Sequence, residues 1–156
     1  MSSKSALYLR LELVWWLFTA LVVALIFYPI YTKLEDYPFY WINGVYIVCI
    51  ITLGRYIFLL PYTFLAYQQV LKVAIVLVSV PFVFYLIEGI HTFNEFIEYG
   101  NLEALTNKLP DSEQPGLQSY IRNEMMLFGV GSVISAVIFP FRLMFSIWRL
   151  RNRGKA

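Results

Sequence analysis

The sequence predicts an all-α integral membrane protein with four transmembrane helices and a short amphipathic helix in its long outer loop. Three observations lead to this prediction: the apolar composition, the length of the apolar blocks, and the sorting of charges along the chain. Of the 156 residues, 60% are hydrophobic and only 14% are charged. Soluble domains carry about 25% charged residues, so this composition is typical of an integral membrane protein.

The hydrophobic residues are concentrated in four blocks, at residues 11–31, 41–61, 70–90 and 125–147. Each block matches the roughly 20 residues that a helix needs to cross about 30 Å of hydrocarbon. Strands of a membrane barrel would alternate apolar and polar side chains, and these blocks do not. The first block is longer than the roughly 7–15 apolar residues of a cleaved signal peptide, so we expect it to be retained. The sequence therefore predicts one four-span domain over residues 1–156.

Charged residues are sorted between alternate ends of these blocks. All acidic residues except Glu12 lie at the ends that face loops 32–40 and 91–124. Most basic residues lie at the opposite ends: Lys4, Arg10, Lys72, Arg142, Arg149, Arg151, Arg153 and Lys155. Lys and Arg near the ends of spans mark the cytoplasmic side. We therefore expect a cytoplasmic (inner) membrane protein with both termini in the cytoplasm and both of these loops outside.

The basic tail after the fourth block, WRLRNRGKA, is open to a second interpretation as a patch that binds nucleic acid or anionic lipid. We favour the simpler interpretation, in which these charges only set the orientation of the chain. Nothing else in the sequence indicates a nucleic-acid partner.

Arg55 is the charged residue placed deepest in a predicted span. Counting from residue 41 at about 1.5 Å per residue puts it about 21 Å below the outer edge of the hydrocarbon. Ionisable residues at such depth are candidates for function. Glu12 lies at a similar depth in the first span and is a plausible partner, and Arg142 could join them. A structural ion pair, or an arginine that reaches the inner headgroups, is favoured over a transport site.

The fourth block contains the clearest helix-packing pattern, in the stretch GVGSVISA. Gly129, Ser132 and Ala136 fall along one side of a helix, and Gly131 and Ser135 form a second pair of small residues four apart. Small residues let helix backbones approach closely in lipid. We therefore expect this helix to pack tightest, against another span or against a copy of itself.

The segment YLIEGIHTFNEFIEYGNLE, residues 85–103, places Glu88, His91, Glu95 and Glu98 on one helix face. Apolar residues cover the opposite side, as in helices that lie at a membrane surface. The sequence therefore predicts a separate amphipathic helix between the third and fourth spans.

The same row of residues has an alternative interpretation as a metal site, because Glu-x-x-His motifs bind metals in di-iron bundles. Such a site would use Glu88, His91, Glu95 and Glu124. Because the chain has a single histidine, a second copy would have to supply the second Glu-x-x-His motif, and Glu35 lies on the same side of the membrane as a further glutamate. A catalytic zinc usually needs more nitrogen or sulfur ligands than one histidine provides. We favour the amphipathic helix and expect no cofactor.

The sequence favours a non-catalytic role. It contains no Gly-rich phosphate loop, no nucleophile elbow and no Ser/His/Asp set. We expect an accessory, structural or partner-binding component of the membrane, in contact with the lipid bilayer and present as a homo-oligomer or within a larger membrane complex. One alternative is a small homo-oligomeric channel or transporter with Arg55 in its path. The other is a metal-dependent membrane enzyme that uses Glu88 and His91.

Overall fold

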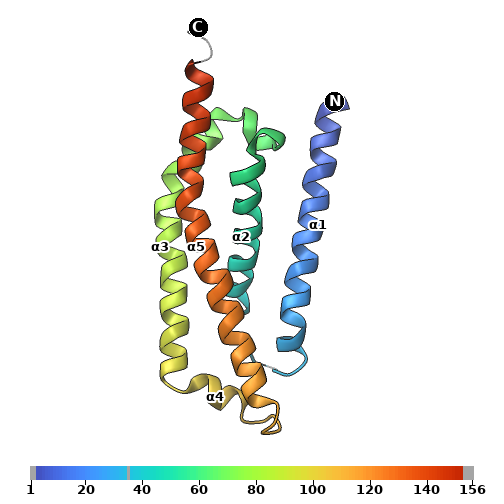
Figure 1. The fold of residues 1–156 in the computed structure, drawn as a ribbon, viewed down its shortest axis with the longest axis vertical. Helices are drawn as coiled ribbons and strands as arrows, with labels where there is room; N and C mark the ends of the chain where they lie inside the picture. Colours follow the sequence, from blue (N-terminus) through green and yellow to red (C-terminus); the bar gives the residue numbers. More distant parts are fainter. Residues whose placement is uncertain (1–2, 35, 153–156) are drawn as a thin grey trace.

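Four long helices make up most of the molecule (Figure 1). The computed structural model describes residues 3–34 and 36–152, with side chains from residue 10 onward except those of residues 64 and 67. Three charged residues of the topology and metal interpretations, Glu35, Arg153 and Lys155, and the side chain of Lys4 lie outside this description. The helices are α1 (Ser3–Tyr31), α2 (Tyr40–Leu59), α3 (Gln69–Glu98), the short α4 (Asn101–Thr106) and α5 (Gln114–Asn152), with 3₁₀ turns at Leu60–Tyr62 and Phe64–Tyr67.

The four long helices are long and apolar enough to cross a membrane, as the sequence predicted. The candidate spans are Arg10–Tyr31, Tyr40–Tyr62, Gln69–Glu98 and Gln114–Asn152. The start of α1 and the end of α5 lie at the same end of the bundle (Figure 1). We call this the termini end, and the opposite end, which holds α4, the α4 end.

Helix α5 lies at the centre of the packing, against both α2 and α3, whereas α1 rests mainly on α2 (Figure 1). The small residues of α5 make this possible. Gly129, Ser132 and Ala136 are buried. A Cβ atom added at Gly129 would lie 3.1 Å from Ile90 of α3, and one added at Gly131 would collide with Ile50 of α2. The small side chains therefore let α5 approach two helices at once.

The region between the third and fourth spans differs from the expected long loop. Helix α3 continues to Glu98 and α5 already begins at Gln114. The connection between them is therefore only Tyr99–Glu113, and it contains α4. Helix α3 ends where Gly100 adopts a left-handed conformation with φ of 70°, which glycine allows at little cost. Pro115 does not break the chain here because it lies in the first turn of α5, where its missing N–H costs no hydrogen bond.

The prediction of a separate amphipathic helix was therefore wrong, because residues 88–98 form the last three turns of α3. Their apolar side packs against other parts of the same chain. Phe93 is fully buried and its ring lies 5.2 Å from that of Phe39. Leu117 and Ile121 of α5 belong to the same core. The acidic face stays exposed simply because it points away from this core.

Candidate functional site

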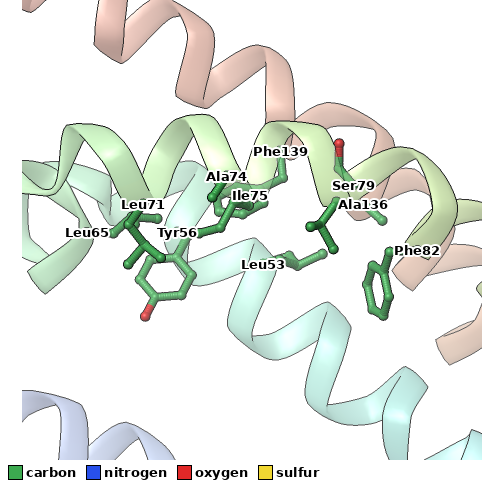
Figure 2. Close-up of a pocket in the computed structure, with 11 residues that line it drawn as sticks. Leu53, Tyr56, Leu65, Leu71, Ala74, Ile75, Ser79, Phe82, Ala136 and Phe139 are labelled. Carbon is green, nitrogen blue, oxygen red and sulfur yellow. The ribbon is translucent and has the colours of Figure 1, made fainter.

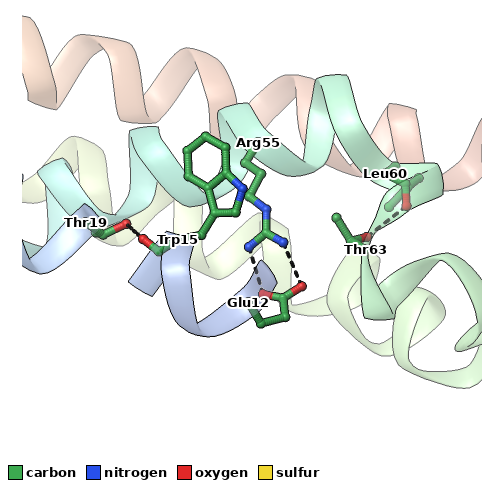
Figure 3. Close-up of polar contacts among 6 residues, drawn as sticks. All are labelled: Glu12, Trp15, Thr19, Arg55, Leu60 and Thr63. Carbon is green, nitrogen blue, oxygen red and sulfur yellow. Dashed lines mark hydrogen bonds and ion pairs between the residues drawn. The ribbon is translucent and has the colours of Figure 1, made fainter. Parts of the chain in front are cut away.

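A bidentate ion pair joins α1 to α2 near the termini end (Figure 3). The Nη1 and Nη2 atoms of Arg55 donate to the two carboxylate oxygens of Glu12 at 2.8 and 2.9 Å. The arginine side chain is only 6% exposed and that of Glu12 17%. Trp15 lies beside the pair, with its ring centre 5.3 Å from the guanidinium carbon. The planar fork of arginine matches a carboxylate, and the aromatic face adds a cation–π contact.

The expected pairing of Glu12 with Arg55 is thus present, but Arg142 does not join it. The Nε atom of Arg142 donates to the backbone oxygen of Ile57 at 3.0 Å. The paired charges of Glu12 and Arg55 largely neutralise each other and hold α1 against α2. A further role of Arg55 in a transport path stays a prediction.

The proposed metal ligands do not come together in one copy of the chain. Glu88, His91, Glu95 and Glu98 are exposed along one side of α3. The only ion-pair contact among them is between His91 Nε2 and Glu95 Oε1, at 3.3 Å. Glu124 is buried and bonds to another partner. Within the described part of the chain, no three His, Cys, Asp or Glu side chains are close enough to hold a metal ion.

Replacing His91 with glutamine is expected to change the free energy of unfolding by less than about 0.5 kcal/mol, as exposed substitutions usually do. The side chain is 64% exposed, and its one polar contact is with a neighbouring turn of the same helix. Thermal unfolding of the purified protein in detergent measures this. A loss of several kcal/mol, or the release of a metal, would contradict the assignment of this row to an exposed helix face.

Four polar residues near the α4 end, Tyr37, Tyr40, Asn43 and Glu124, form a group that we call the buried polar cluster. The sequence did not indicate that these four residues lie together. The Nδ2 atom of Asn43 donates to Glu124 Oε1 at 2.5 Å, and both residues are buried. Burial raises the pKa of the Tyr37 hydroxyl, so this phenol stays protonated at neutral pH.

Four oxygen atoms of this cluster are buried without a hydrogen-bond partner among the described residues: Tyr37 Oη, Tyr40 Oη, Asn43 Oδ1 and Glu124 Oε2. Such atoms are costly when desolvated, so the cluster is a place where this protein departs from ordinary core packing. An asparagine inside an apolar block was the sequence signal that could have identified it. From the sequence, Glu124 was considered only as a metal ligand together with Glu88, His91 and Glu95, which lie on the exposed face of α3.

The small residues predicted as a packing face all lie on α5. Gly129, Ser132 and Ala136 are buried, and Gly131 and Ser135 are half-buried. Ser132 satisfies its hydroxyl within the helix by donating to the Gly129 carbonyl at 2.8 Å. These residues pack the bundle itself, within one copy of the chain.

An apolar groove runs along the open side of α2 and α3. Its first part, of about 500 Å³, is lined by α2, α3 and α5 and includes Tyr56, Ala74, Ser79 and Phe139 (Figure 2). Its second part, of about 480 Å³, lies beside α1 and includes Trp16, Trp41 and Cys49. The two parts share the lining residues Leu53 and Phe82, so they adjoin, and we refer to them together as the apolar groove.

Comparison with known proteins does not assign this chain to a family. The chain matches no protein-family model, and no curated protein or solved structure is significantly similar to it.

Proposed function

We propose that this chain is a non-catalytic structural component of the cytoplasmic membrane that assembles with further copies of itself. The observation that carries the proposal is the apolar groove. In this proposal the groove takes helix α1 of a neighbouring copy. The basic residues Arg149 and Arg151 in the last turn of α5 support a cytoplasmic position for the termini end.

The dimensions of the groove suit a helix. Along α2 it extends from Trp41 to Tyr56, which is about 22 Å at 1.5 Å per residue. That length covers most of the roughly 30 Å of hydrocarbon in a bilayer. Small side chains at Gly44, Ala74 and Ala136 line it, and small residues allow another helix to approach closely.

Helix α1 offers a matching surface. Leu13, Leu17, Leu21 and Leu25 follow each other at intervals of four residues and are 57–73% exposed. Residues four apart form a ridge on a helix, and such ridges pack into grooves on other helices. The ridge is about 18 Å long and points away from α2, since Glu12 and Thr19 occupy the opposite side of α1.

The depths of the two surfaces also agree. Trp16 of α1 lines the groove together with Leu53 and Phe82, so these three residues lie at a similar depth in the membrane. Leu17 is the next residue after Trp16. In two neighbouring copies with the same orientation, Leu17 of one copy therefore lies at nearly the same depth as Phe82 of the other. A contact of ridge to groove uses two different surfaces, so it is heterologous, and repeated around an axis it can close into a ring.

The experiment is cysteine cross-linking between two differently tagged copies in one membrane. One copy carries Leu17→Cys and the other Phe82→Cys, both in a Cys49→Ala background because Cys49 lines the groove. We expect a mixed-tag cross-linked dimer in high yield, because the two positions face each other in the proposed contact.

The matched control replaces Phe82→Cys with Val137→Cys. Val137 is exposed and adjoins Ala136 of the groove, so it has a similar depth but a different direction. Equal cross-linking of both pairs would indicate random collision and contradict the proposal. Cross-linking of Phe82→Cys to a different membrane protein, with none to Leu17→Cys, would replace self-assembly with an accessory role.

A further inference from the structure

A fully buried lysine lies at the start of α3, near the termini end. Lys72 has 0% exposure, and its Nζ atom donates to the Ala66 backbone oxygen at 2.6 Å and to Ser146 Oγ at 3.0 Å. Both acceptors are neutral, so neither cancels the positive charge. Burying a charge is costly unless a counter-charge compensates it.

Two arginines of α5 add to this charge. Arg142 lies one helical turn before Ser146, which accepts a hydrogen bond from Lys72, and its Nε atom donates to the backbone oxygen of Ile57. Arg149 follows two turns later on the same side of α5. Both arginines line a cavity of about 180 Å³ together with Leu60, Pro61, Ala66 and Ser146. We call this cavity the basic pocket, and Lys72 binds two of its lining residues.

Within the part of the chain that the structure describes, no acidic side chain lines the basic pocket. Of the nine acidic residues in that part, eight lie toward the α4 end: Asp36 and those from Glu88 to Glu124. The remaining one, Glu12, is taken up by Arg55. Two arginines line this concave site, and the Lys72 ammonium group bonds to two of its other lining residues. An anion from outside the chain therefore compensates these three positive charges best.

We propose that the basic pocket binds the phosphate group of an anionic phospholipid. Arginine guanidinium groups hold phosphate oxygens by paired, charge-assisted hydrogen bonds. The volume of the pocket is far above the roughly 15 Å³ that a single water needs. This inference is independent of the proposed assembly, since the basic pocket and the apolar groove have no lining residue in common.

The surroundings of the basic pocket favour a lipid headgroup over free phosphate. Tyr62 and Trp148 are 66% and 64% exposed in the segments that form the pocket, and aromatic residues of this kind mark the boundary between lipid and water. Basic residues at the cytoplasmic boundary attract anionic lipids, by about 1 kcal/mol for each charge.

The test is native mass spectrometry of the full chain in detergent, titrated with phosphatidylglycerol and, separately, with zwitterionic phosphatidylcholine. We expect one phosphatidylglycerol to bind with at least tenfold preference. Arg149→Gln should weaken that binding about fivefold, and Arg142→Gln with Arg149→Gln about 25-fold. Arg149 is exposed, so its replacement leaves the fold intact even if replacement of Arg142 does not.

Arg151→Gln is the matched control, because Arg151 is also exposed on the last turns of α5 but does not line the basic pocket. An equal loss of binding in Arg151→Gln and Arg149→Gln would show a diffuse surface attraction and overturn the proposal. Equal binding of both lipids would overturn it as well. Displacement of the lipid by millimolar inorganic phosphate would assign the pocket to free phosphate and overturn the lipid headgroup.

Discussion

Replacing Glu12 with glutamine is expected to lower the free energy of unfolding by about 3 kcal/mol, as the loss of one partner from a buried ion pair does. The change leaves Arg55 in place, 6% exposed and without its carboxylate. Equilibrium unfolding in detergent, followed by the fluorescence of the tryptophans, measures the loss. Trp15 reports on the pair directly because its ring adjoins the guanidinium group.

Two further variants separate the pair from a general charge effect. Glu113→Gln removes one partner of the exposed pair with Lys33 and should cost less than about 1 kcal/mol. Glu12→Leu combined with Arg55→Met should restore most of the stability, because apolar residues of similar volume replace buried ion pairs well. Equal effects of Glu12→Gln and Glu113→Gln would contradict a structural role of the pair.

Replacing Gly129 with leucine is expected to lower the free energy of unfolding by about 3 kcal/mol, the upper range for overpacked cores. A Cβ atom there already lies 3.1 Å from Ile90 and 3.4 Å from Tyr46. The three further carbons of leucine have no space unless α5 moves away from α2 and α3. The same unfolding measurement applies, together with gel filtration to detect loss of the compact bundle.

Gly54→Leu is the control for the leucine substitution. A Cβ atom at Gly54 meets no atom within 4 Å, although this glycine also lies inside a long apolar helix. We expect Gly54→Leu to be neutral or slightly stabilising, since glycine weakens a helix by about 1 kcal/mol relative to alanine. A neutral Gly129→Leu variant would mean that α5 is not held at the distance described.

The buried polar cluster could not be predicted from the sequence. Asn43 and Glu124 are 81 positions apart, and their hydrogen bond forms only because α2 and α5 lie side by side. Glu124 and His91 were expected to lie together because both fall within the same predicted outer loop. In the folded chain they lie on different sides of their helices, one buried and the other exposed.

The amphipathic segment 88–98 makes the same point. Its helical periodicity was correct, and its exposed face was correct. The error concerned what covers the apolar side, because a helix at a membrane surface and a helix packed on protein have the same pattern. Lys72 is a similar case. From the sequence it was interpreted only as a charge that sets the orientation of the chain, but α5 packs beside α3 and buries it completely.

The sequence by itself determined the number of the long apolar helices, the position of the apolar block in each, and the clustering of charges at the ends of these blocks. These properties depend on contiguous residues, and hydropathy and helical spacing report them directly. Only the tertiary structure decided which polar groups are paired, which stay without a partner, and where a groove and a basic pocket form. Those features depend on residues distant in the sequence, whose contacts are set by how the helices rotate and pack against one another.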